Sequence, residues 1–221
     1  MSEHRVAVIT GASQGLGLAL AHELAGRGWR LVLDARHGDV LRDAALSLDG
    51  GPHRVVAGDV ADAGHRRDLV EAAAGLGGAS LLVNNASTLG TVEGSARPQP
   101  RLAELDAATY RRVLEVNLVA PVALATGLLT QLREHRGTVV NVSSDAAVEA
   151  YAGWGAYGSS KAALAHVSRV LAAEEPALRV QVVDPGDMRT AMHQDAFPGE
   201  DISDRPEPDA AAQRIADLVA A

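Results

Sequence analysis

Short hydrophobic runs alternate along this chain with longer stretches in which apolar residues recur at helical spacing. The first run, Val6–Ile9, is unbroken, as in a strand that helices cover on both faces of a parallel sheet. We interpret five later runs as further strands, at residues 31–33, 54–57, 81–83, 138–142 and 180–183. The alternation predicts an α/β fold in one domain, residues 1–221: a doubly wound parallel sheet of the Rossmann type, with six strands and helices on both faces.

A glycine-rich turn joins the first strand to a helix with apolar periodicity. Its glycines, Gly11, Gly15 and Gly17, permit a tight turn and a close approach of a pyrophosphate to the backbone. The following helix would offer free N–H groups and its positive dipole end to that charge. An ordinary strand-to-helix turn is the alternative explanation, since a single glycine cluster is weak evidence.

Polar or turn-forming residues follow every predicted strand. They are Gly11, Asp34 to Arg36, Asp59 and Val60, Asn84 to Ala86, Ser143 and Ser144, and Asp184 to Gly186. In open α/β sheets, ligands bind outside the carboxyl ends of the strands. Any one of these groups is explained by a polar turn, but six together predict one ligand cleft.

Two segments interrupt the alternation and are predicted to be loops. Residues 87–101 are rich in Gly, Pro and Ser, and residues 188–208 are rich in Pro, Asp and Glu. We expect residues 188–208 to form a substrate loop that closes over the ligand as a lid. A short alanine-rich helix, Asp209–Ala220, is predicted next, and no seventh strand is expected.

The charge and composition narrow the classes of ligand. A formal net charge of −8 offers no basic face to nucleic acid or to an anionic membrane, which favours a small-molecule ligand. The chain has no cysteine, so disulfides and thiolate metal sites are excluded and no metal is predicted. No apolar run approaches the ~20 residues that span a bilayer, and the first strand begins without a signal-peptide pattern, so we expect a cytoplasmic protein.

A tyrosine and the single lysine of the chain are the main candidates for catalysis. Tyr157 and Lys161 lie four residues apart in a helix predicted at residues 156–171, so their side chains share one face. A neighbouring ammonium stabilises a phenolate and lowers its pKa from ~10, which predicts that Tyr157 acts as an acid and base. Ser144, at the end of the fifth strand, would hydrogen-bond the same substrate oxygen. A surface pair is the alternative for Tyr and Lys at this spacing.

Taken together, these motifs resemble the short-chain dehydrogenase/reductase family in order and spacing over nearly the whole chain. The residues that carry the resemblance are Thr10 to Gly17, Asn84 to Ala86, Asn117, Ser144, Tyr157, Lys161, Pro185, Gly186 and Thr190. The resemblance implies an enzyme that transfers a hydride between a nicotinamide cofactor and a carbonyl or secondary alcohol. Tyr157 would be the acid and base, and Ser144 would position the carbonyl. Lys161 would bind the nicotinamide ribose and lower the tyrosine pKa, and Asn117 would hold the water of a proton relay.

The resemblance also implies a set of cofactor contacts. The glycine turn would bind the pyrophosphate, through a set that comprises Gly11, Ser13, Gln14, Gly15, Leu16 and Gly17. The adenine would lie against Asp59 and Val60, and the ribose side against Asn85 and Ala86. The carboxamide would be held by Pro185, Gly186 and Thr190, and Tyr157 and Lys161 would also contact the cofactor.

The segment after the second strand bears on the choice between NAD and NADP. An acid there grips the 2′-hydroxyl of NAD, whereas an arginine accepts the 2′-phosphate of NADP. By resemblance, the position of the NAD-specific acid falls on Ala35 and that of the NADP-specific arginine on Arg36. Successive side chains of a strand point to opposite faces of the sheet, so Asp34 is expected to point away from the face that carries Ala35. A solvated charge is the alternative for Arg36, and Gln14 stands where many NADP users have a second basic residue. We predict NADP(H) as the preferred cofactor, with NAD(H) as the alternative.

The remaining expectations concern the substrate and the assembly. Residues 146–154 and 188–197 would line the substrate pocket, with packing as the alternative role for each candidate: Glu149, Tyr151, Trp154, Met192 and Phe197. Ser87 replaces the glycine that the family has after Asn-Asn-Ala. The helix that carries Tyr157 and Lys161 is expected to pair two subunits in a homodimer. A dinucleotide-binding regulatory protein without turnover is the alternative function.

Overall fold

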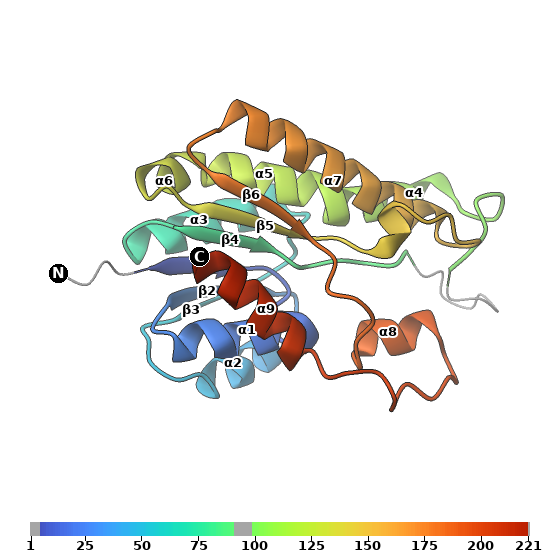
Figure 1. Ribbon diagram of the computed structural model, residues 1–221, viewed down its shortest axis with the longest axis horizontal. Coiled ribbons are helices and arrows are strands. Elements are labelled where there is room, and N and C mark those ends of the chain that lie inside the picture. The colour runs from blue at the N-terminus through green and yellow to red at the C-terminus, as the bar shows by residue number, and fades with distance from the viewer. Residues whose placement is uncertain (1–4, 91–98, 221) are drawn as a thin grey trace.

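Six strands form one parallel sheet in the computed structural model, which describes residues 5–90 and 99–220. The strands are β1 (Val6–Ile9), β2 (Arg30–Ala35), β3 (Arg54–Ala57), β4 (Leu81–Asn84), β5 (Thr138–Val142) and β6 (Arg179–Val183). Their order across the sheet is β3-β2-β1-β4-β5-β6, and every neighbouring pair is parallel (Figure 1). The predicted doubly wound sheet is confirmed, and the described residues contain no seventh strand.

Helices cover both faces of this sheet (Figure 1). One face carries α1 (Gly15–Gly26), α2 (Gly38–Leu46) and α9 (Asp209–Ala220), and the other carries α3 (Ala63–Gly75), α5 (Ala120–Gly127), α6 (Leu129–Glu134) and α7 (Gly155–Glu174). In β1, Ala7 and Ile9 pack with the first group of helices, whereas Val6 and Val8 pack with the second. The unbroken apolar run of β1 therefore reflects a strand that is buried on both faces.

Strands β2, β4 and β6 extend beyond their predicted ranges. The added residues include the polar Asp34, Asn84 and Arg179. Each pairs with its neighbouring strand in register, as Asp34 does with Val56 and Asn84 with Asn141. Backbone pairing is indifferent to the polarity of the side chain, so hydrophobicity alone predicted these strands to be too short.

A short helix, α8 (Ala191–Ala196), forms within the segment predicted as the loop 188–208. The hydroxyl oxygen of Thr190 accepts a hydrogen bond from the backbone N–H of His193 at 3.3 Å and so caps the first turn. Met192 and Ala196, four residues apart, pack against a cluster that contains Tyr157. The prediction of a loop was therefore wrong for these residues: the Pro and acidic residues of the whole segment hid a short run of helix formers, which tertiary contacts stabilise.

Two further segments bear on the site. Between α4 (Ala107–Leu114) and α5 the chain forms a π-helical turn, Glu115–Val119, a feature often found at functional sites. In the predicted loop 87–101, the described residues 87–90 and 99–101 form no helix or strand, and the others lie outside the described residues. Of the helices in the described ranges, none is long and apolar enough to cross a membrane.

Candidate active site

The carboxyl ends of the strands open onto a cavity of about 830 Å³, a size typical of small-molecule sites. Most of the predicted site residues line it: Gly11, Ser13, Gln14, Gly15, Leu16, Arg36, Asp59, Val60, Asn85, Ala86, Ser144, Tyr157, Lys161, Pro185, Gly186 and Thr190. Gly17 and Asn117 do not line it but support its wall. The parallel sheet therefore brings together polar groups that are far apart in the sequence.

The glycine turn leaves no room for side chains. Gly11 has a φ of +67°, a conformation that favours glycine. A Cβ atom on Gly17 would overlap the carbonyl oxygen of Gly11 and lie 2.6 Å from Asn85 Nδ2. Gln14, the residue before α1, makes no capping hydrogen bond with its side chain, which leaves the first N–H groups of the helix open to an anion. This cradle fits the pyrophosphate of a dinucleotide.

Asn85 holds the glycine turn from the neighbouring strand. Its Nδ2 donates to the carbonyl oxygens of Thr10 and Gly11 at 2.9 and 3.1 Å. The hydroxyl oxygen of Thr10 accepts in return from the backbone N–H groups of Asn85 and Ala86, both at 3.0 Å. The Asn85 side chain thus fastens the ends of β1 and β4, and its ribose contact stays a prediction.

At the end of β2 the acid, Asp34, is buried, whereas the arginine, Arg36, is exposed. Asp34 is 1% exposed, and its Oδ1 lies 2.6 Å from Nε2 of His65 on α3, whereas Ala35 packs on the opposite face of the sheet. The predicted orientation of Asp34 is confirmed. Burial raises the pKa of Asp34, and the hydrogen bond to this carboxyl group raises the pKa of His65. Arg36 is exposed and lines the cavity, so its guanidinium is free to meet a ligand, whereas the carboxyl group of Asp34 is held by His65.

The end of β3 carries a fixed carboxylate. Asp59 Oδ1 accepts a hydrogen bond from the backbone N–H of Ala61 at 2.9 Å, and its other oxygen pairs with Arg112. Burial alone would raise the pKa of Asp59, but the hydrogen bond and the ion pair outweigh it and lower the pKa. Val60 packs with Val116 in a small apolar cluster. The predicted adenine site therefore has an apolar floor beside an anchored charge.

Tyr157 and Lys161 meet inside the protein. Lys161 is 2% exposed, and its Nζ donates to the carbonyl oxygen of Val142 at 2.8 Å. The same nitrogen lies 5.4 Å from the centre of the Tyr157 ring. Burial lowers the pKa of Lys161 to about 8. A solvated surface pair, the alternative at this spacing, is excluded by this burial.

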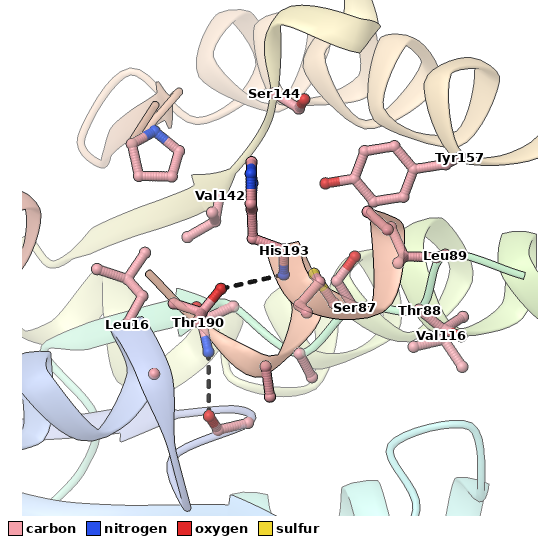
Figure 2. Close-up of a pocket in the computed structure, with 18 of the residues that line it drawn as sticks. Leu16, Ser87, Thr88, Leu89, Val116, Val142, Ser144, Tyr157, Thr190 and His193 are labelled. Atoms are coloured by element: carbon pink, nitrogen blue, oxygen red, sulfur yellow. Dashed lines mark hydrogen bonds between the residues drawn. The ribbon is translucent and has the colours of Figure 1, made fainter. Parts of the chain in front are cut away.

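The predicted lowering of the Tyr157 pKa was wrong for the protein without ligands. Burial raises the pKa of Tyr157 to about 12, although the nearby hydroxyls of Ser144 and Ser87 act in the opposite direction. The loss of water around a phenolate is the largest cause, and the charges of Asp184 and Asp145 act in the same direction. Tyr157 is therefore protonated at neutral pH, and its hydroxyl and that of Ser144 face one open region of the cavity (Figure 2).

Asn117, in the π-helical turn, is 1% exposed and braces the cavity wall. Its Nδ2 donates to the carbonyl oxygen of Thr88 at 2.9 Å and to Ser160 Oγ at 3.0 Å. Its Oδ1 accepts from the hydroxyl of Ser87 at 3.2 Å and from the backbone N–H of Thr88 at 2.9 Å. These contacts occupy both N–H groups and both acceptor positions of the Asn117 amide. Its role in a water relay stays a prediction. Ser87, noted only as a departure from the family pattern, donates its hydroxyl to Asn117 Oδ1, and the same hydroxyl acts to lower the pKa of Tyr157.

An aromatic wall leads from Tyr157 to α8. Ring centres are 5.5 Å apart for Tyr157 and Trp154, 6.0 Å for Trp154 and Phe197, and 5.0 Å for Phe197 and His193. The predicted pocket residues Tyr151 and Met192 also line the cavity, but Glu149 does not. Glu149 was therefore predicted wrongly. Sequence reasoning missed His193, because a lone histidine in a segment read as a loop gives no signal.

The fold and the cavity define a dinucleotide-binding oxidoreductase of the α/β class. A family model described as short chain dehydrogenase matches residues 5–201. The chain therefore belongs to the short-chain dehydrogenase family and is an oxidoreductase that binds a nicotinamide dinucleotide. Its motifs predicted this membership correctly.

Individual proteins of the family are similar over most of their length. Sepiapterin reductase from Rattus norvegicus is 36% identical over 204 residues, which cover 86% of this chain and 76% of that protein. The crystal structure of the KRED1-Pglu enzyme has a TM-score of 0.88 and 31% identity, covering 98% of this chain and 95% of that one. An alcohol dehydrogenase from the archaeon Thermococcus sibiricus, complexed with 5-hydroxy-NADP, has a TM-score of 0.85 and 27% identity. The match covers 99% of this chain and 92% of that one.

Proposed function

We propose that the protein reduces a carbonyl group, or oxidises the corresponding secondary alcohol, with NADP(H) as its preferred cofactor. One observation carries the proposal: the buried pair Tyr157 and Lys161 and the half-buried Ser144 line the same cavity as the open N-terminus of α1. The first group provides proton transfer to oxygen, and the second provides an anion site. When bound, the nicotinamide supplies or accepts the hydride.

The chain itself would hold the substrate oxygen and move its proton. In the reductive direction, the phenol of Tyr157 donates its proton to the carbonyl oxygen, because a pKa of about 12 keeps it protonated at neutral pH. The hydroxyl of Ser144 donates to Asp145 Oδ1 at 2.9 Å in this structure; it would turn to donate to the same substrate oxygen and stabilise the charge that develops there. Lys161, whose Nζ lies 5.4 Å from the ring centre, stabilises the phenolate that remains.

The preference for NADP(H) rests on the end of β2. Arg36 is exposed on the cavity wall, where its guanidinium would pair with a 2′-phosphate. Asp34, the acid that would otherwise grip a ribose hydroxyl, is 1% exposed and bonded to His65. The solved relative from Thermococcus sibiricus carries an NADP derivative. These observations favour NADP(H) over NAD(H).

Three further features belong to this proposal. The chain would work as one domain, residues 1–221, and two copies would pair through α7 as a homodimer. Residues 188–208, with α8 among them, would close over the substrate as a lid. Slow hydrogen exchange in this segment, equal with and without ligands, would count against the lid, and sedimentation as a monomer would count against the dimer.

A panel of ketones tests the proposed function. We expect oxidation of NADPH, followed at 340 nm, with at least one aryl or cyclic ketone, and alcohol formation confirmed by chromatography. The alternative, a regulatory protein that binds the dinucleotide without turnover, predicts thermal stabilisation by NADPH but no alcohol product from any ketone. The Tyr157→Phe variant is the control, because it should bind NADPH without reducing a ketone.

A further inference from the structure

The side chain of His193 stands in the active-site cavity with one nitrogen unused. It is 11% exposed, and its Nε2 is buried and has no hydrogen-bond partner among the described residues. Figure 2 shows the ring rising from α8 into the region that the hydroxyls of Ser144 and Tyr157 also face. Buried polar atoms in native proteins are almost always paired. The missing partner of Nε2 is therefore to be sought in a ligand.

The position of His193 is fixed by the contacts of α8. Thr190 caps the helix at the backbone N–H of His193, and its methyl carbon would lie 3.4 Å from a Cβ placed on Gly15 of the glycine turn. On the other side, Met192 and Ala196 pack with the cluster around Tyr157. The imidazole therefore belongs to a helix that touches both the predicted cofactor cradle and the catalytic wall.

The surroundings of the ring define what Nε2 can bind. The Nδ1 atom lies 3.7 Å from Oδ1 of Asp187, which is too long for a hydrogen bond, but the charge of this carboxylate favours the tautomer with its proton on Nδ1. In the neutral imidazole Nε2 is then an acceptor. The ring of Phe197 lies 5.0 Å away, and Trp154 continues the aromatic wall to Tyr157. The site presents one acceptor beside apolar ring faces that are tilted to one another by 40° for Trp154 and Phe197.

We propose that His193 is a specificity-determining residue: its Nε2 accepts a hydrogen bond from a hydroxyl or N–H group of a carbonyl substrate whose flat apolar body lies against Trp154 and Phe197. This inference rests on the proposed function and adds a substrate class to it. The carbonyl oxygen of the substrate accepts hydrogen bonds from the hydroxyls of Tyr157 and Ser144. The second polar group of the substrate donates a hydrogen bond to His193. A ketone that lacks the donor loses this contact.

Matched ketone pairs test the inference. The probes are 3′- and 4′-hydroxyacetophenone, each compared with its fluoro analogue, with kcat and KM measured for the wild type and for His193→Phe, which keeps a ring next to Phe197. We expect the variant to lose about tenfold in kcat/KM on at least one hydroxy ketone, mainly through KM, and less than about twofold on its fluoro partner. His193→Gln, which restores an acceptor oxygen, should recover part of the loss.

Binding measurements without turnover complete the test. Calorimetry should show the same loss of affinity for the hydroxy ketone in His193→Phe and an unchanged Kd for NADPH. The control Asp195→Asn alters an exposed residue of α8 outside the cavity and should behave as wild type. Equal losses on both members of each pair, or weaker NADPH binding in His193→Phe, would overturn the inference. If the wild type reduces other ketones of the panel but none of these four, the inference alone is overturned; if it reduces no ketone at all, the proposed function fails as well.

Discussion

The ammonium nitrogen of Lys161 lies 5.4 Å from the centre of the Tyr157 ring, yet it donates its hydrogen bond to the carbonyl oxygen of Val142. The two side chains thus share a buried site without forming a direct hydrogen bond. In the absence of ligands, burial moves their pKa values apart, to about 8 for the lysine and about 12 for the tyrosine. Relative to water, the buried surroundings favour the neutral amine of Lys161 and the neutral phenol of Tyr157.

The buried ammonium should cost the ligand-free protein stability. The pKa of Lys161 falls from 10.5 to about 8 on folding, so between these pH values the unfolded chain binds more protons and the stability of the folded state rises with pH. Lys161→Met removes the charge. We expect it to be more stable than the wild type at pH 7, by about 1–3 kcal/mol, with the difference shrinking between pH 8 and 10.5.

Urea denaturation at pH 7 and pH 10 measures this difference. Tyr157→Phe, which retains the lysine, is the matched control and should keep the pH dependence of the wild type in this window. Parallel pH profiles for Lys161→Met and the wild type would show that the ammonium is not destabilised by burial.

Removal of the phenol hydroxyl should stop catalysis. Tyr157→Phe takes away the proton that we assign to the substrate oxygen and leaves the ring packed against Trp154. We expect kcat for ketone reduction to fall by about 100- to 10,000-fold, while calorimetry shows nearly unchanged NADPH binding. Turnover at the wild-type rate would remove Tyr157 from the mechanism.

A single methyl group in the glycine turn should destroy the cofactor cradle. In Gly17→Ala the new Cβ would overlap the Gly11 carbonyl oxygen, which is backbone and cannot move aside freely. We expect at least a tenfold weaker Kd for NADPH, together with a lower melting temperature, since overpacking costs about 1–3 kcal/mol.

The same helix supplies the control for this substitution. Gly26, at the other end of α1, has no neighbouring atom within 4 Å of the position that a Cβ would occupy, so Gly26→Ala should stabilise the protein by about 0.5–1 kcal/mol. It should leave NADPH binding unchanged. If Gly17→Ala binds NADPH as well as Gly26→Ala does, the turn is not the pyrophosphate site.

The choice of cofactor should depend on Arg36. Arg36→Ala removes the guanidinium from the cavity wall, and Asp34 cannot take its place because it is bonded to His65. We expect kcat/KM with NADPH to fall by about 10- to 100-fold, the loss of a charge-assisted contact of ~1.5–3 kcal/mol, with little change for NADH.

Steady-state kinetics with both cofactors checks this expectation. Arg42→Ala is the control, since Arg42 is exposed, pairs with Asp39 and does not line the cavity. A wild type that prefers NADH, or a ratio of the two kcat/KM values that Arg36→Ala leaves unchanged, would contradict the assignment of NADP(H).

The sequence by itself determined the fold and the location of the site. Unbroken apolar runs such as Val6–Ile9 occur where both faces of a strand are covered, and β1 is buried in this way. Because all the strands are parallel, the polar residues that follow them reach one edge of the sheet and line one cavity. Local pattern and a rule of topology were sufficient for both conclusions.

The partners, the pKa values and the positions of the site residues depend on contacts that form only in the folded protein. The partner of Asp34 is His65, 31 positions away, and the pKa of Tyr157 is set by burial that no spacing along a helix reveals. Likewise α8 forms because Met192 and Ala196 find apolar neighbours around Tyr157, and it carries His193 into the cavity. Desolvation, hydrogen-bond partners and packing depend on segments that meet only after folding, so they could not be predicted from the periodicity of the sequence.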